Sequence, residues 1–96
     1  MMDNLLDGDG YPTEITLKRC RELTGTETAE DILSSLELIW HWPHHVRLSG
    51  NVLELHTGGW SGNEDVIEAL SESMFWLVCW MESKRGGHHR FDLSKR

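Results

Sequence analysis

The stretch that decides the fold of this 96-residue chain is residues 46–55, VRLSGNVLEL. Two runs of alternating apolar and polar side chains flank Gly50-Asn51, a pair that favours the tight turn of a two-residue β-hairpin. With this turn, Arg47 faces Glu54, and the apolar residues share the other face: Val46, Leu48, Leu53 and Leu55. Register, turn chemistry and charge agree, so the sequence predicts a hairpin here, with strands over residues 45–49 and 52–57.

Two amphipathic helices are expected before the hairpin, over residues 12–24 and 28–42. In the second helix, Thr28 stands at the N-cap position and Asp31 three residues later, much as in a capping box. Apolar side chains then recur at helical spacing. Pro43 ends this helix because it disfavours the helical conformation at the residue before it.

A third and longer helix is predicted over residues 63–83, followed by a strand over residues 88–94. Apolar side chains recur at helical spacing in the first segment and alternate in the second, with Gly86-Gly87 between them. The order is α-α-β-β-α-β, and the last β-α-β unit has the length of a right-handed crossover between parallel strands. We therefore expect an α+β domain with a three-stranded sheet packed on helices. The last strand would run parallel to the second strand of the hairpin.

This architecture makes two further predictions. A helix of about 20 residues is roughly 30 Å long, so the glycine-rich segments 58–63 and 84–87 should lie at opposite ends of the molecule. Ser94 and Lys95 should then lie beside the first of these segments. The core should contain Trp40, Leu53, Leu55, Leu70, Leu77 and Phe91.

The composition indicates one small acidic domain, over residues 11–96, after a flexible segment 1–10. The net charge is −7, and the basic excess is confined to residues 84–96. Such an acidic body argues against direct binding of duplex DNA, which needs cations across a face. No signal-peptide features and no apolar run of about 20 residues are found. We expect a cytoplasmic protein without membrane association, with Cys20 and Cys79 as buried free thiols.

Six histidines raise the question of a metal site. In the hairpin register His45 stands opposite His56, close enough in principle to share an ion. However, the chain lacks the Cys and His spacings of common zinc motifs. We therefore expect no metal and no other cofactor.

The most distinctive segment is residues 57–65, TGGWSGNED. Glycines permit close approach of another group, and a strand-to-helix turn presents backbone N–H groups that can bind an anion. Glu64 and Asp65 already occupy the positive helix end, and the Lys-Ser/Thr pair of a P-loop is missing. Ser61 does not lie in a Gly-x-Ser-x-Gly elbow. These features favour a non-enzymatic protein.

Trp60 predicts a protein-binding surface, because an aromatic side chain with a polar rim is typical of an interface hot spot. The alternative is that its ring folds back over the start of the third helix. The predicted binding residues are Trp60, Ser61, Asn63 and Glu64 in this loop, and Arg85 and His88 on a second surface.

The string TGGWSGNE at residues 57–64 and RGGH at residues 85–88 resemble a group of small uncharacterised proteins encoded by bacteriophages and prophages. Further residues that carry the resemblance are Tyr11-Pro12-Thr13, Trp42-Pro43, Phe75-Trp76, Trp80 and Phe91. The resemblance implies a phage accessory protein that acts in the bacterial cytoplasm on a host protein or complex. Inhibition of a host defence system, as by anti-CRISPR proteins, is one such function.

Two other interpretations stay open. The protein is a small-ligand or nucleotide-binding accessory enzyme that uses the Gly58–Asn63 loop, or it binds a second copy of itself as a homodimer. Turnover of a nucleotide by the purified protein would favour the first of these over protein binding.

Overall fold

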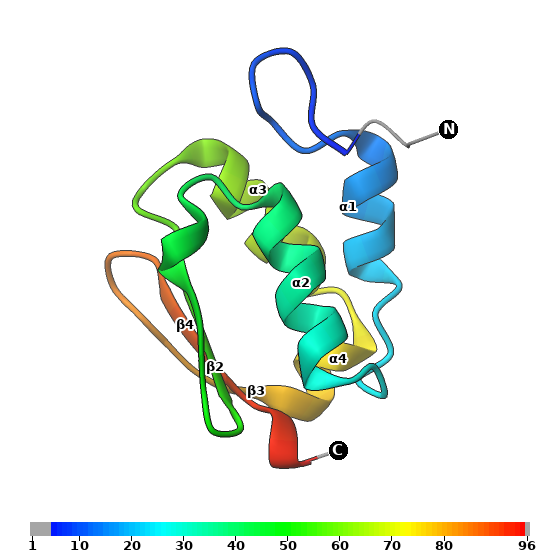
Figure 1. Ribbon diagram of the computed structural model, residues 1–96, viewed down its shortest axis with the longest axis vertical. Coiled ribbons are helices and arrows are strands. Elements are labelled where there is room, and N and C mark those ends of the chain that lie inside the picture. Colours follow the sequence, from blue (N-terminus) through cyan, green and yellow to red (C-terminus); the bar gives the residue numbers. More distant parts are fainter. Residues whose placement is uncertain (1–4, 96) are drawn as a thin grey trace.

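The computed structural model describes residues 5–95 and shows an α+β domain. In Figure 1 the strands lie on one side of the molecule, and α1 and α2 lie on the other. The helices are α1 (Glu14–Arg21), α2 (Ala29–Ile39), α3 (Ser61–Leu70) and α4 (Met74–Cys79). The strands are β1 (Val46–Ser49), β2 (Val52–His56), β3 (Trp80–Lys84) and β4 (His88–Asp92), and two short 3-10 helices are η1 (Pro43–His45) and η2 (Leu93–Lys95).

The predicted hairpin is confirmed pair by pair in β1 and β2. The cross-strand partners are Val46–Leu55, Arg47–Glu54, Leu48–Leu53 and Ser49–Val52. The predicted cap of α2 is also present, since the Thr28 hydroxyl accepts the N–H of Asp31 at 3.1 Å. Both elements depend on residues close together in the sequence, where turn and cap chemistry act directly.

The predicted helix over residues 63–83 is wrong, because the chain divides into α3, α4 and β3. At the break, the Ser73 hydroxyl donates to the carbonyl of Leu70 and accepts the N–H of Trp76 at 3.1 Å, so it ends one helix and caps the next. The backbone becomes extended after α4. Gly86 and Gly87, with φ of +90° and +81°, then form the turn of a second hairpin.

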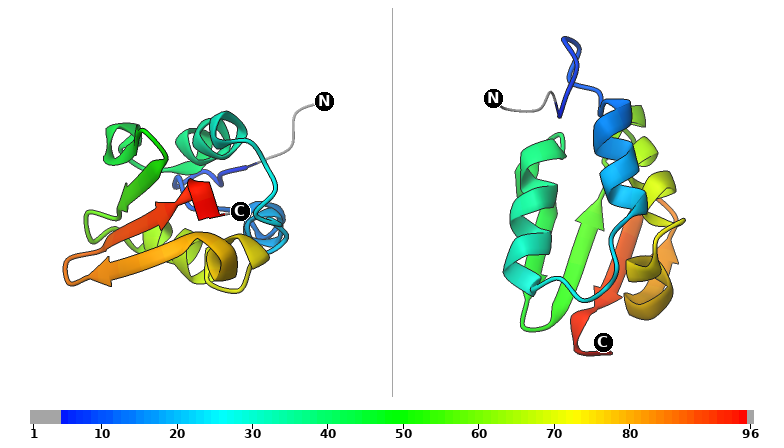
Figure 2. Two further views of the ribbon diagram at one scale, coloured as in Figure 1. Left: turned by 90° about the horizontal axis from the view of Figure 1, so that it is seen from below. Right: turned by 90° about the vertical axis from the view of Figure 1, so that its right-hand side faces the viewer.

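The sheet has four strands rather than three, in the order β1-β2-β4-β3, and every neighbouring pair is antiparallel. The prediction of a strand parallel to β2 is wrong because a strand, and not a helix, leads into β4. Each hairpin contributes one central strand and one edge strand. Figure 2 shows β2 and β4 side by side in the centre.

One face of the sheet packs against the helices and forms the core. Five of the six predicted core residues are buried: Trp40, Leu53, Leu55, Leu70 and Phe91. The sixth, Leu77, is 75% exposed. In α4 the buried side chains are instead Phe75 and Cys79, which are four residues apart and share a helix face.

The other face of the sheet is polar. Across the four strands, Arg47, Glu54, Arg90 and Glu82 stand in one row with alternating charge. Arg90 contacts Glu54 at 3.4 Å and Glu82 at 2.8 Å. This is the pattern of an antiparallel sheet with one face covered and the other open to water.

The chain before α1 forms a turn. The Asp7 carboxylate accepts the N–H groups of Asp9 and Tyr11, both at 2.9 Å, and Leu6 pairs with Pro12. Residues 1–4 of the segment predicted to be flexible lie outside the described residues. Cys20 and Cys79 are free thiols and both are buried, as expected.

Candidate functional site

The two glycine-rich turns meet at one edge of the sheet. The N–H of Thr57 donates to the carbonyl of Gly87 at 2.9 Å. A Cβ on Gly87 would overlap the Thr57 hydroxyl and would lie 3.4 Å from a carboxylate oxygen of Glu64. The prediction that these segments lie at opposite ends of the molecule is therefore wrong, because β3 carries the chain back to its starting edge.

The end of β4 lies elsewhere, against the β1–β2 turn. There the N–H of Leu93 donates to the carbonyl of Asn51 at 2.8 Å. Ser94 follows directly, so the prediction that it lies beside the Gly58–Asn63 loop is also wrong. The start of β4, not its end, reaches that loop.

Seven aromatic and imidazole rings form a continuous row along this edge, which we call the ring row. Successive ring centroids are 4.7, 4.5, 4.4, 5.8, 6.2 and 4.4 Å apart. In order, the rings are those of Tyr11, Trp60, His41, Trp42, His45, His56 and His88. All seven side chains are exposed or half-buried, so the row is part of the surface.

Trp60 is half-buried in the first part of the row. Its ring lies over Gly62, where any Cβ would overlap it, and between the rings of Tyr11 and His41. The Tyr11 hydroxyl and the Ser61 hydroxyl are 2.8 Å apart. Trp60 therefore covers the first turn of α3 and also contributes to the surface.

Asn63 is fully buried and positions the neighbouring loop. Its side-chain oxygen accepts the N–H of His41 at 2.9 Å. Its side-chain nitrogen donates to the carbonyls of His41 at 3.0 Å and Thr57 at 3.1 Å. Of the predicted binding residues, Asn63 is therefore not itself part of the surface. It holds in place the backbone that carries His41 and Trp42.

Trp42 is held in an unusual backbone conformation. Among residues 5–95 it is the only residue other than glycine with a positive φ, at 63°, and it is 40% exposed. Its ring packs on Gly58, where a Cβ would be only 2.6 Å from the indole. The left-handed region costs an L-residue about 1–2 kcal/mol, and such strain is concentrated at functional sites.

The far end of the ring row lines a pocket of about 450 Å³ on the polar side of the sheet, which we call the histidine pocket. His56 and His88 are cross-strand partners whose Nδ1 atoms face each other. Nδ1 of His45 is buried and has no hydrogen-bond partner in the described part of the chain. The lining residues are His44, His45, Arg47, His56, Gly58, Gly86 and His88.

Burial is the main cause that lowers the pKa of His56, and the neighbouring imidazoles lower it further. Glu54, whose carboxylate is 3.8 Å from Nε2, has the opposite effect. Burial likewise lowers the pKa of His89, which lies on the inner face of β4. No group of three or more His, Cys, Asp or Glu side chains within residues 5–95 is arranged to hold a metal ion. The sequence indicated the nearness of His45 and His56, but not that of His56 and His88, which depends on the pairing of β2 with β4.

Charged side chains flank the ring row. Glu64 is exposed in the first turn of α3, beside Gly87, and Arg85 is exposed in the β3–β4 turn. The fold thus brings Trp60, Ser61, Glu64, Arg85 and His88 to one surface instead of two.

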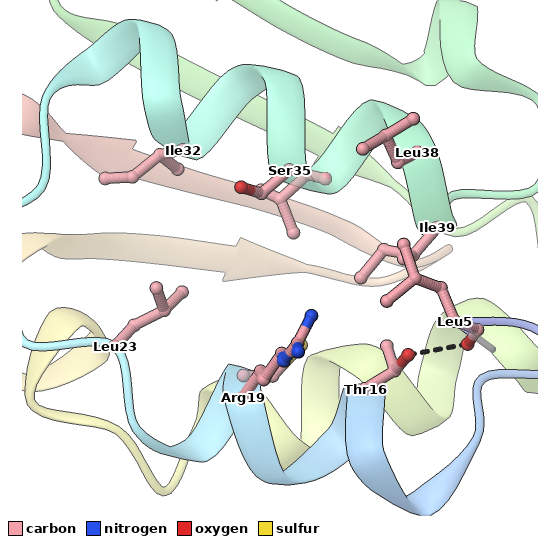
Figure 3. A pocket seen from close by; sticks show the side chains of 10 residues that line it. Leu5, Thr16, Arg19, Leu23, Ile32, Ser35, Leu38 and Ile39 are labelled. Carbon is pink, nitrogen blue, oxygen red and sulfur yellow. Dashed lines mark hydrogen bonds between the residues drawn. The ribbon is translucent and has the colours of Figure 1, made fainter. Parts of the chain in front are cut away.

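A second cavity, of about 300 Å³, lies between α1 and α2 and is mainly apolar (Figure 3). Leu23 and Ile32 line one end of it, and Leu5 and Ile39 line the other. Cys20 also lines it, and burial raises the pKa of this thiol to about 11. The cavity shares no lining residue with the histidine pocket.

Comparison with known protein families, with functionally characterised proteins and with solved structures gives no match to this chain. No helix in the described part of the chain has the length and apolar character needed to cross a lipid bilayer.

Proposed function

We propose that this protein acts by binding another protein through the ring row. The observation that carries the proposal is the continuity of seven partly exposed rings along one edge of the domain, at centroid distances of 4.4 to 6.2 Å. Aromatic side chains dominate the energetic centres of protein interfaces, where polar groups form the rim. Here Ser61, Glu64 and Arg85 supply such a rim.

The rigidity of this edge supports the same function. Trp42 is fixed by its packing on Gly58, and the backbone of the preceding residue, His41, is fixed by two hydrogen bonds to Asn63. A side chain that is already ordered in the free protein loses little conformational entropy on binding. The strained φ of Trp42 is explained if the indole must stand at this position for a partner.

We propose a bacterial host protein or complex as the partner, because of the resemblance of residues 11–93 to phage and prophage proteins. Inhibition of a host defence system, as by anti-CRISPR proteins, is the specific form of this proposal. An acidic domain of net charge −7 suits a protein surface with basic groups better than it suits duplex DNA.

The alternative of a nucleotide-binding accessory enzyme has weaker support. The indole of Trp60 lies over Gly62, in the turn that would have to approach a phosphate. Glu64 adds a negative charge to the same first turn of α3, where it repels a second anion.

The test compares two tryptophans of similar exposure, one inside the ring row and one outside it. Trp42 is 40% and Trp80 is 43% exposed. Immobilised wild-type protein, Trp42→Ala and Trp80→Ala are incubated with host lysate, and the affinity of each captured protein is then measured by titration. We expect Trp42→Ala to weaken the specific partner by about 2 kcal/mol or more, as at a hot spot, and Trp80→Ala to leave it within about 0.5 kcal/mol.

The outcomes separate the candidate functions. A partner that Trp42→Ala and Trp60→Ala both retain would place binding outside the ring row. Loss with Trp80→Ala alone would move the interface to α4 and β3, where Met74 and Leu77 are also exposed. Capture of the chain itself, with a doubled mass in solution, would identify a homodimer, and nucleotide turnover without any partner would favour the enzyme.

A further inference from the structure

The histidine pocket has an unusual charge pattern for this protein. The chain carries a net charge of −7, yet the pocket is lined by four histidines, Arg47 and two glycines, without a single Asp or Glu. The lining is therefore a local exception to the acidic surface. It can become more positive when imidazoles take up protons, since histidine titrates near neutral pH.

The lining side chains offer more hydrogen-bond donors than acceptors, because a neutral imidazole has one of each and Arg47 has donors only. Arg47 carries up to five N–H donors at any ordinary pH, and each imidazole carries at least one. Nδ1 of His45 is buried without a partner among residues 5–95. Because an unsatisfied buried polar atom is costly, a turn of the His45 ring that brings Nδ1–H to an oxygen acceptor in the pocket would be stabilising.

The facing imidazoles of His56 and His88 also favour an anion in the pocket. With their Nδ1 atoms in contact, one ring must donate and the other accept, so the pair holds a first added proton more readily than a second. Two protonated rings would repel each other, and an anion beside them would offset this repulsion. Burial is the larger cause of the lowered pKa of His56, and the neighbouring His88 is the next; Glu54 opposes both.

We propose that the histidine pocket binds an oxyanion through Arg47, His45 and the His56–His88 pair. We further propose that in the complex this oxyanion is a carboxylate of the partner protein. The second statement rests on the proposed function, but the first does not. Phosphate offers the same oxygen chemistry, so the experiment uses both anions.

Other charged and titratable groups near the pair affect its response to pH. They are His44 and His45 on η1, Arg47 on β1, Glu54 on β2, His89 on β4 and Glu64 on α3. Glu54 is the nearest carboxylate, and it is also in contact with Arg90 at 3.4 Å. If binding of the oxyanion brings one proton onto the pair, the dissociation constant of the oxyanion rises by up to about tenfold per pH unit, at pH values above the midpoint of that proton uptake.

The test follows the histidine side-chain NMR signals of the full chain from pH 5.5 to 8. Inorganic phosphate and a peptide of three glutamates with blocked ends are added in separate titrations. We expect each anion to shift the signals of His56 and His88, to raise their titration midpoints, and to bind more tightly at low pH. Arg47→Gln and His88→Gln, both at exposed positions, should each weaken binding fivefold or more.

The matched control is Arg21→Gln, since Arg21 is a surface arginine on α1 that pairs with Glu14 at 2.5 Å. This variant should bind both anions like the wild type. Signals that neither anion moves, or an equal response to a peptide of three lysines, would overturn the oxyanion site. Binding of phosphate without the glutamate peptide would overturn the carboxylate of a partner as its source. A partner that is lost with Trp42→Ala while the pocket ignores both anions would leave the proposed function intact and refute this inference.

Discussion

Leu70 and Leu77 provide the sharpest test of the architecture that brings the two glycine-rich turns together. In a continuous helix over residues 63–83 these leucines, seven residues apart, would share one stripe and one degree of burial. In the structure Leu70 is fully buried and Leu77 is 75% exposed. Truncation to alanine should therefore have very different effects at the two positions.

We expect Leu70→Ala to lower the free energy of unfolding by about 2–5 kcal/mol, the cost of a cavity in a packed core. Leu77→Ala should change it by less than about 0.5 kcal/mol, as a surface substitution does. Since 1 kcal/mol corresponds to roughly 4–8 °C in a domain of this size, thermal melts should separate the variants by at least roughly 6 °C. Urea titrations should agree.

Equal losses at the two positions would refute the division of this segment into α3, α4 and β3. If Leu70→Ala is too unstable to fold, Leu70→Val leaves a smaller cavity and keeps the comparison measurable. Far-ultraviolet circular dichroism of Leu77→Ala should match the wild type, which excludes a change of fold as the reason for its small effect.

Three further predictions concern backbone strain and titration. Trp42→Gly should be about 1 kcal/mol more stable than Trp42→Ala in urea titrations, because only glycine adopts the positive φ at this position without strain; an alanine variant of equal or greater stability would contradict the left-handed conformation. Cys20 should make the free energy of unfolding fall between pH 9 and 11 by up to about 3 kcal/mol, because the pKa of its thiol is 9.0 in the unfolded chain and about 11 in the folded one. In this range the unfolded state holds fewer protons than the folded state. Cys20→Ala should therefore reduce the fall of the melting temperature between pH 9 and 11. Gly87→Ala should destabilise the domain more than Gly59→Ala, although both glycines have φ near +80°, because only the first Cβ would overlap the Thr57 hydroxyl; equal thermal shifts would show that the two turns do not meet.

The elements predicted correctly from the sequence are those fixed by nearby residues. The Gly50-Asn51 turn sets the register of the first hairpin, and the Thr28 hydroxyl caps α2 by accepting the N–H of Asp31, three residues later. Neither depends on a distant part of the chain.

The third helix was predicted wrongly because its helical pattern of apolar side chains continues across a break in the chain at Ser73. Residues 63–83 carry apolar side chains at helical spacing, but Ser73 offers a cap inside that pattern and β3 follows it as an edge strand. The cap was the available local signal. Tertiary pairing with β4 decides the conformation of Trp80–Lys84, because a short segment has little intrinsic preference of its own.

The candidate site was predicted residue by residue but not as an arrangement. Trp60, Ser61 and Glu64 were singled out on one side, and Arg85 and His88 on the other. Their meeting depends on the bond between Thr57 and Gly87. Trp42 and His41 were missed as surface residues, although Trp42-Pro43 is a local signal of an unusual backbone.

The central pairing of β2 with β4 also determines when this surface arises during folding. Each hairpin closes a short loop, whereas His56 and His88 are 32 positions apart in the chain. Closing the longer loop costs more chain entropy, so contacts of this kind form later than local ones. A chain in which both hairpins exist but have not yet docked therefore lacks the last contact of the ring row, between His56 and His88. Substitutions that weaken docking would thus weaken recognition without touching any residue that a partner contacts.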